Sequence, residues 1–250
     1  MIKLKNISQV FDNGNEKNQV LKSLDLEIPE GQFVTVIGSN GAGKSTLFNI
    51  ISGNLRPTAG SIHIDGKDVL KDSRSKRAAI VACVFQDPNS GVCPELTIAE
   101  NMALANARGK VRGLTWAIRK KDLAYFREKL LEFNLGLENM LRKKASLLSG
   151  GQRQVVTLLM ATLQKPKLLL LDEHTAALDP RIAKQVMTIT KKLVEEQKIT
   201  TIMISHNMSD AIAYGDRLIM LKSGEIVLDI SGEEKKALTP ADLITMFESQ

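Results

Sequence analysis

Residues Gly38 to Thr46, with the sequence GSNGAGKST, constrain this chain more than any other stretch. They follow the pattern G-x-x-x-x-G-K-[ST], between an apolar run (Phe33 to Ile37) and a helical pattern (Leu47 to Ile51). A glycine-rich loop between a strand and a helix directs successive backbone N–H groups toward one anion, and the helix N-terminus adds a favourable dipole. We therefore expect a phosphate-binding loop, because the alternative of an ordinary glycine-rich turn does not explain this context.

The residue types in this loop suit a nucleoside triphosphate. Gly38, Gly41 and Gly43 let the backbone curl around the phosphates. Lys44 would supply positive charge to the outer phosphates, and Ser45 would supply a hydroxyl ligand for Mg²⁺. The other positions expected to line the same nucleotide are Ser39, Asn40, Ala42 and Thr46.

Composition limits the remaining classes of function. The 250 residues are 43% hydrophobic and 25% charged, which is typical of an ordinary globular protein. No apolar run approaches the ~20 residues that a membrane-spanning helix needs, and the N-terminus lacks the apolar segment of a signal peptide. Any role at a membrane is therefore expected to come through a partner.

The formal net charge of +6 would allow nucleic acid or an acidic membrane surface as a partner. The positive charge is local, in the runs 71–77, 108–112, 119–121 and 142–144. These runs lack the interleaved aromatic residues of a single-strand binding surface, so nucleic-acid binding is not expected. Cys83 and Cys93 have no metal-ligand spacing and predict thiols rather than a disulfide.

The first third of the chain reads mainly as β-structure. Strands are predicted at Ile2–Val10 and Val20–Ile28, followed by the phosphate-loop strand. A hairpin is predicted over Ser61–Val69, turning at Asp65-Gly66, and a further strand over Ala79–Phe85. This region therefore combines an antiparallel part with strands of a parallel core.

Helical patterns dominate from Asp87 to Lys144. They cover Thr97–Ala107, where Thr97 and Glu100 form a capping box, and Ala117–Phe133; the Gly- and Arg-rich stretch Arg108–Gly113 separates them. We interpret 87–144 as a helical subdomain inserted into a nucleotide-binding core made of 1–86 and 145–250. The whole chain is then a single α/β domain.

After this insert, strands and helices alternate. Strands are predicted at Leu168–Asp172, Thr200–Ser205 and in a hairpin of Arg217–Leu221 with Glu225–Asp229. Helices are predicted from Leu148 to about Gln164, and then over the segments 182–196, 208–214 and from 239 onward, the last with a cap and an early proline. Such alternation after a phosphate loop predicts a parallel sheet, with ligands at the carboxyl ends of its strands.

Polar residues stand at those strand ends. Asp172 is expected to hold Mg²⁺ beside Ser45, and Glu173 to orient or deprotonate an attacking water. Gln86 would ligate Mg²⁺ or water and sense the γ-phosphate, and His206 would bond the γ-phosphate as its charge grows. Each has a plain structural alternative: solvated strand-end carboxylates, a turn residue before Asp87-Pro88, and a satisfied loop histidine.

The pentapeptide Leu148-Ser-Gly-Gly-Gln152 resembles the signature motif of the ABC-type ATPases. It precedes Leu168–Glu173 at that family's distance, and Asp87-Pro88, Ala177-Leu-Asp179 and His206 also stand in their expected places. The resemblance covers the whole chain. It implies a P-loop NTPase of ABC type that hydrolyses ATP, with ATP and Mg²⁺ as its ligands.

The resemblance also implies a dimer. Ser149, Gly150 and Gly151 begin a helix and would offer N–H groups to an anion, although the chain already has one such site. In this family two subunits pair head to tail, so the signature residues 149–152 of one close over the ATP held by the other, and Asp179 lies at the joint. Phe11 matches the aromatic residue that stacks on adenine, with Val20 beside it; a core role for Phe11 is the alternative.

Three positions depart from the usual family pattern. Phe11 stands where tyrosine is more common, and Val155 stands where many members have arginine. His174 follows Glu173 where proline is usual. His174, together with the segments 86–91 and 94–101, resembles a small importer subgroup that is sometimes assigned to aromatic or branched amino acids.

The resulting hypothesis is an ATPase subunit of a bacterial ABC importer, most simply of amino acids or another small solute. It implies a homodimer at the cytoplasmic face of the cell membrane, docked through the insert on separate integral permease subunits and served by an extracytoplasmic binding protein. The alternative is a soluble or exporter-type ABC ATPase that acts without a binding protein. A soluble ATPase acting on DNA or ribosomes is disfavoured, because the chain has one cassette and no coiled-coil insert.

Overall fold

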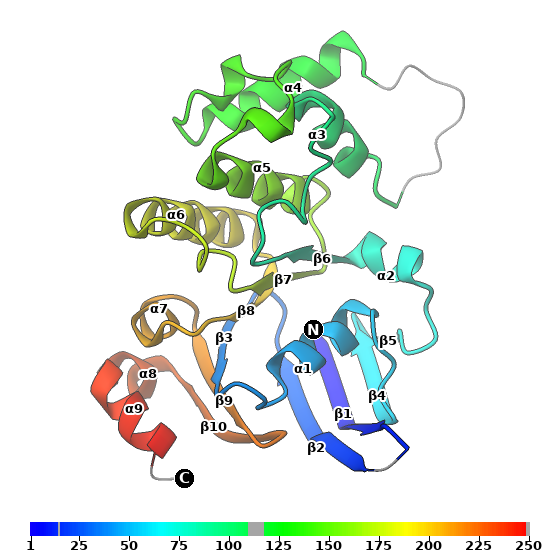
Figure 1. Cartoon of the computed structure of the whole chain (residues 1–250), viewed down its shortest axis with the longest axis vertical. Helices are drawn as coiled ribbons and strands as arrows, with labels where there is room; N and C mark the ends of the chain where they lie inside the picture. The colour runs from blue at the N-terminus through cyan, green and yellow to red at the C-terminus, as the bar shows by residue number, and fades with distance from the viewer. Residues whose placement is uncertain (15, 110–117, 249–250) are drawn as a thin grey trace.

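The computed structural model describes residues 1–14, 16–109 and 118–248, and it contains two β-sheets with helices around them (Figure 1). The first sheet is antiparallel, with the strand order β2-β1-β4-β5. The second has the order β10-β9-β3-β8-β7-β6 and is mostly parallel. Antiparallel and parallel parts in one chain agree with the α/β architecture expected from the sequence.

The antiparallel sheet is built from the N-terminal segments. Its central strand β1 pairs with β2 on one side and β4 on the other, so that Ile2 lies opposite both Ile28 and Ile64. The strand bounds are β1 Ile2–Asp12, β2 Lys17–Ile28, β4 Ala59–Ile64 and β5 Lys67–Asp68. The predicted hairpin at Asp65-Gly66 is present, but β5 has only two residues, Lys67 and Asp68.

The parallel sheet carries the phosphate-loop strand at its centre. Strand β3 pairs in parallel with β8 and β9, and β8, β7 and β6 follow in parallel, while β10 pairs antiparallel with β9 at the edge. The bounds are β3 Phe33–Gly38, β6 Val81–Val84, β7 Leu168–Asp172, β8 Thr200–Ile204, β9 Arg217–Lys222 and β10 Glu225–Ser231. Every residue of β3 is buried, as expected of a strand covered on both faces.

The two faces of this sheet pack against different elements. Leu168 and Leu170 of β7 point to one face, where they join a core with helix α1 (Lys44–Ser52) and the antiparallel sheet. Leu169 and Leu171 point to the opposite face and join a core with α5 (Gly150–Thr162) and α6 (Pro180–Gln197). The period-2 alternation of a strand therefore places α1 and α5 on opposite faces of one sheet.

Helices α3 (Ile98–Asn106) and α4 (Lys120–Leu131) lie beyond α5 at the end of the molecule opposite the antiparallel sheet (Figure 1). The predicted capping box of Thr97 and Glu100 is confirmed. The predicted start of α4 at Ala117, and most of the stretch Arg108–Gly113, lie outside the described residues. Two short 3-10 helices, η1 (Leu137–Asn139) and η2 (Ala145–Leu147), lead from α4 to α5. We propose that residues 87–144 form the helical subdomain of the chain.

The C-terminal part of the chain adds helices after strands β8 and β10 of the parallel sheet. Helix α7 (Met208–Ala213) follows β8, and α8 (Gly232–Ala237) and α9 (Pro240–Glu248) follow β10. Thr239 accepts a hydrogen bond from the Asp242 N–H and donates to its carboxylate, which confirms the predicted cap. Helix α8 was not predicted from the sequence. Among the described residues, no helix is both long and apolar enough to cross a membrane.

The predicted strand Ala79–Phe85 is wrong in its first part. Ala79 and Ile80 end a helix, α2 (Arg74–Ile80), and the strand covers only Val81–Val84. The helix starts at Ser73, whose side chain accepts a hydrogen bond from the Lys76 N–H. Its only described buried residue, Arg77, donates to the carbonyls of Ile51 and Val69. This tertiary anchoring decides where the helix lies, and apolar composition does not reveal it.

Candidate nucleotide site

The phosphate loop connects β3 to α1 through left-handed glycines. Gly41 and Gly43 have φ angles of 82° and 102°, a region that glycine adopts without strain. A Cβ on Gly43 would lie 2.7 Å from Leu21 Cδ2 and 3.0 Å from the Val20 carbonyl oxygen. Gly43 is also the N-cap of α1 and offers no side-chain oxygen to the first N–H groups of the helix. Those N–H groups therefore stay available to an external anion.

Lys44 holds the loop in its curled shape. The side chain is only 6% exposed, and Nζ donates to the carbonyl oxygens of Gly38 at 2.7 Å and Ser39 at 2.9 Å. Burial lowers the pKa of Lys44, whereas the nearby Glu173 and Asp172 carboxylates raise it. A buried cation beside two carboxylates, at an uncapped helix N-terminus, is suited to a ligand that brings several negative oxygens and a divalent cation.

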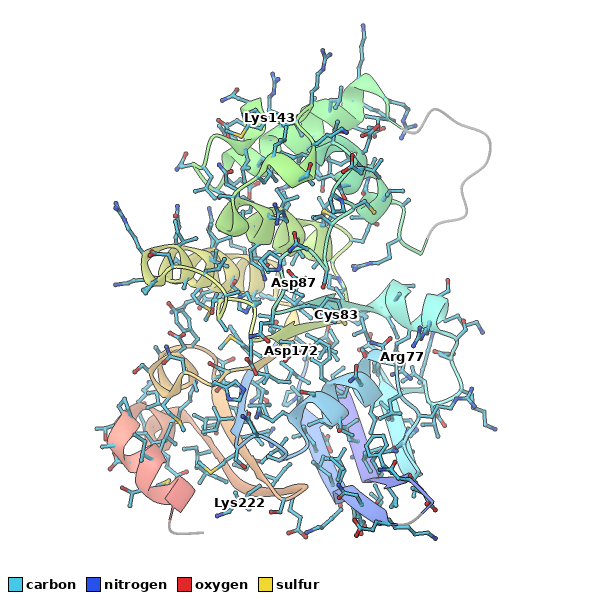
Figure 2. All side chains as sticks on the ribbon, in the orientation of Figure 1. Arg77, Cys83, Asp87, Lys143, Asp172 and Lys222 are labelled. Atoms are coloured by element: carbon cyan, nitrogen blue, oxygen red, sulfur yellow. The ribbon has the colours of Figure 1, made fainter. Side chains whose placement is uncertain are left out.

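Two acidic residues end β7 beside this loop. Asp172 is the last residue of the strand, and Figure 2 shows it near the middle of the molecule. Burial and the neighbouring Glu173 raise the pKa of Asp172, against the opposing effects of Lys44 and His206. Glu173 has a left-handed φ of 45°, which turns its side chain out of the strand register. Glu173 Oε1 contacts His206 Nε2 at 2.5 Å.

A cavity of about 730 Å³ adjoins this pair, lined by Glu173, His206 and residues of α6 and α7. His174 lies in its wall and is 1% exposed, and burial lowers its pKa to about 4. Its Nε2 lies 3.1 Å from Thr190 Oγ1, and that hydroxyl already donates to the Val186 carbonyl. His174 Nε2 is therefore the donor, and the residue after Glu173 is fixed to α6.

The residues predicted for Mg²⁺ offer the oxygen ligands that this ion prefers. Ser45 is exposed in the first turn of α1, and Asp172 is close enough to affect the pKa of Lys44, the residue before Ser45. A hydroxyl, a carboxylate and water fit a hard cation that retains part of its hydration shell. Gln86 is exposed in the turn after β6 and would approach the same ion through its amide oxygen. We propose Ser45, Asp172 and Gln86 as the magnesium ligands.

The residues predicted to hold the base lie on the antiparallel sheet. Phe11 is 39% exposed near the end of β1, so the alternative of a core role does not apply. Val20 on β2 brings its carbonyl beside Gly43, so this strand borders the phosphate loop. We propose that Phe11 stacks on the adenine with Val20 beside it.

The signature residues are at the start of α5, which packs on the opposite face of the parallel sheet from α1. The predicted helix start at Leu148 shifts by two residues, since Ser149 is the N-cap and Gly150 the first helical residue. Ser149 Oγ accepts from the Gln152 N–H, and Gln152 Oε1 accepts from the Ser149 N–H at 3.1 Å. Asp179 caps the neighbouring α6 by accepting from the Arg181 N–H at 2.9 Å.

The predicted site residues thus fall into two groups. The phosphate loop, Asp172, Glu173 and His206 lie together at the carboxyl ends of β3, β7 and β8. The residues 149–152 lie on α5, across the sheet from α1. Asn89 and Arg153 connect the turn after Gln86 to α5 and were not among the predicted site residues. The sequence signal for this contact was the basic residue Arg153, directly after the signature motif.

The model of the family described as ABC transporter matches residues 21–176. The chain belongs to the ABC transporter family as an ATP-binding subunit, and such subunits are ATPases. Cassettes of this family dimerise and couple to membrane permease subunits.

Individual relatives resemble the chain over most of its length. A tyrosine transport ATP-binding protein of Clostridioides difficile is 46% identical over 250 residues, covering 99% of each chain. A phosphonates import ATP-binding protein of Halalkalibacterium halodurans is 36% identical, covering 92% of this chain and 88% of that protein. A solved dimeric cassette of Methanocaldococcus jannaschii, bound to ADP and Pi, superposes with a TM-score of 0.79 at 33% identity, covering 92% and 98% of the two chains.

Proposed function

We propose that this chain is the ATPase subunit of an importer and that it works as a head-to-tail homodimer. The observation that carries the proposal is the placement of two glycine-rich helix N-termini, those of α1 and α5, on opposite faces of one sheet. The signature residues 149–152 cannot reach the nucleotide in their own phosphate loop from that position. A second copy, facing the first, would bring them to it.

The described side chains then have distinct tasks in hydrolysis. Lys44 and the N–H groups of the loop bind and orient the phosphates of ATP. Ser45, Asp172 and Gln86 would hold Mg²⁺, which would supply charge neutralisation when it is bound. Glu173 accepts a proton from, or orients, the water that attacks the γ-phosphate in line, and His206 donates to the γ-phosphate oxygens.

The contact between Glu173 and His206 supports these roles. With 2.5 Å between Oε1 and Nε2, the imidazole fixes the orientation of the carboxylate. Glu173 is 16% exposed and His206 is 46% exposed, so both groups are accessible to a ligand. A γ-phosphate and its water would take the place of this contact, with each residue keeping a partner.

The importer role is supported by the relatives. Their names describe transport of tyrosine and import of phosphonates or of spermidine and putrescine. The relative that is 46% identical, which is named for tyrosine transport, supports an amino acid as the transported solute. We therefore propose a location at the cytoplasmic face of the cell membrane, on integral permease subunits, with an extracytoplasmic binding protein delivering the solute.

The test is the substitution Glu173→Gln. Steady-state ATPase activity should fall by about 10²- to 10⁴-fold, the usual contribution of a general base, while ATP affinity stays within a few-fold of the unchanged protein. Sedimentation should show a dimer that forms only with ATP. Glu196→Gln, on the exposed side of α6, is the matched control and should hydrolyse ATP normally.

Unchanged turnover in Glu173→Gln would refute the assignment of the base. The same variant, tagged and loaded with ATP, should also retain a multi-span membrane protein when it is purified from detergent-solubilised membranes. Recovery of ribosomes or nucleic acid without a membrane protein would refute the transporter role and leave the ATPase role intact.

A further inference from the structure

A polar network joins the turn after β6 to the helix that carries the signature residues. Asp87 Oδ1 accepts from the backbone N–H of Asn89 at 2.9 Å and from its side-chain Nδ2 at 2.8 Å. The other end of the same amide, Asn89 Oδ1, lies 2.5 Å from Arg153 Nη1 on α5. The amide of Asn89 therefore presents its donor to a carboxylate and its acceptor to a guanidinium, and these two contacts fix its orientation. In Figure 2, Asp87 lies on the side of Asp172 that faces α5.

The remaining donors of Arg153 hold the backbone that leads into the signature. Nη2 donates to the Leu148 carbonyl at 2.9 Å and to the Ser146 carbonyl at 3.4 Å, and Nε donates to the Ala145 carbonyl at 3.3 Å. These carbonyls belong to η2 and to the residue just before the N-cap Ser149. One rigid guanidinium thus contacts both the turn that contains Gln86 and the approach to the signature.

The same side of α5 packs closely against this turn. Gln154 is fully buried, and its Nε2 donates to the carbonyl of Phe85, the residue before Gln86, at 3.2 Å. A Cβ on Gly91 would lie 2.2 Å from Thr157 Cγ2, so the side chain of Thr157 packs directly against the backbone of Gly91 and leaves no room for a larger residue there. The turn 85–91 and α5 therefore form one packed unit, and a shift of Gln86 would move the N-terminus of α5.

We propose that Asn89 and Arg153 are positioning residues that transmit the state of Gln86 to the signature of the same subunit. ATP in one phosphate loop would thereby adjust how that subunit closes over the ATP of its partner. The inference depends on the proposed head-to-tail dimer. The geometry favours this route because α1 and the signature lie on opposite faces of the sheet and the turn after β6 connects them.

The experiment uses full-length protein with Glu173→Gln, so that ATP persists. Into this background we would introduce Asn89→Leu, which keeps the side-chain shape but cannot accept the Arg153 hydrogen bond, and separately Arg153→Met. ATP affinity is measured on dilute protein, and ATP-dependent dimerisation is measured by sedimentation. Both variants should bind ATP within about twofold of the parent, while their dimer dissociation constants rise about tenfold, the usual effect of losing a charge-assisted hydrogen bond.

Two comparisons separate positioning from general damage. Glu95→Gln removes an exposed ion pair with Lys144 in the same region and should leave dimerisation unchanged. The double variant Asn89→Leu/Arg153→Met should dimerise no more weakly than Arg153→Met alone, because both substitutions remove the same hydrogen bond. Unchanged dimerisation in Asn89→Leu, fully multiplicative effects, or an equal loss of ATP binding would each overturn the inference. A Glu173→Gln parent that fails to dimerise with ATP would overturn the proposed function, and this inference with it.

Discussion

The N-termini of α1 and α5 are both rich in glycine, yet they are built differently. At α1 the N-cap is Gly43, which provides no side-chain acceptor, and the buried Lys44 folds back onto two loop carbonyls. At α5 the N-cap Ser149 and the third helical residue, Gln152, satisfy each other's backbone N–H groups. The first helix start is stabilised by the contacts of Lys44 with the loop, and the second by its own side chains.

This difference indicates how each site meets its ligand. The uncapped N–H groups of α1 are held in place by burial, so this site is formed before the phosphates arrive. The N-terminus of α5 is exposed and self-sufficient, so it is stable when no partner is present. A site that binds its ligand within one subunit can leave its donors open, whereas a site that is completed only by dimerisation has to be stable alone.

The largest expected effect is at the phosphate loop. Lys44→Met should lower ATP affinity about 10- to 150-fold, because it removes a charge-assisted contact to the phosphates worth ~1.5–3 kcal/mol. Equilibrium binding of ATP to dilute protein measures this. Lys184, in the wall of the neighbouring cavity, supplies the matched control Lys184→Met, which should keep the parental affinity. Equal affinity in the two variants would remove the basis for the comparison.

Glycine-to-alanine substitutions at the two helix starts test the comparison through the free energy of unfolding. Gly43→Ala places a Cβ at φ 102° against Leu21, and should lower the free energy of unfolding by about 1–3 kcal/mol or more. In Gly150→Ala the new Cβ would lie 3.6 Å from Leu178 Cδ2, an ordinary contact. This substitution should change the free energy of unfolding by no more than about 0.5 kcal/mol. Urea unfolding without nucleotide tests both. Similar losses in the two variants would contradict the view that the two helix starts differ in their tolerance of a Cβ.

The smallest effect concerns the cap of α5. Ser149→Ala removes the acceptor for the Gln152 N–H and should lower the free energy of unfolding by ~1 kcal/mol. Ser149→Asp restores a capping oxygen and should recover the loss. ATP binding to the single subunit should be the same in all three proteins, since α5 lies across the sheet from α1. A change in that affinity would show that the signature contacts the nucleotide of its own chain.

Local sequence signals accounted for much of the fold. The phosphate-loop pattern predicted β3 and α1, and the capping box at Thr97 predicted the start of α3. The continuous apolar run at 168–172 and the segment 200–205 predicted buried strands, which is what β7 and β8 are. These features depend on residues that are close in sequence, so a single chain reveals them.

Features that depend on distant partners were less accessible. Arg77 lies in a basic run that reads as a solvated helix face, yet it is 2% exposed and holds the end of α1 through the Ile51 carbonyl. His174 was evident only as a departure from the family pattern, and its burial against Thr190 follows from the packing of α6. The contact of Asn89 with Arg153 likewise joins residues 64 positions apart. No local pattern encodes such pairs.

The strand order has a consequence for how the protein is made. The strand that leads into the phosphate loop, β3, ends at residue 38, but its two neighbours are β8 and β9, which end at residues 204 and 222. During synthesis the loop therefore follows a strand with two unpaired edges until most of the 250 residues have emerged. Competence to bind ATP should appear late and abruptly, when β9 docks, and shorter nascent chains have an apolar strand that chaperones need to shield.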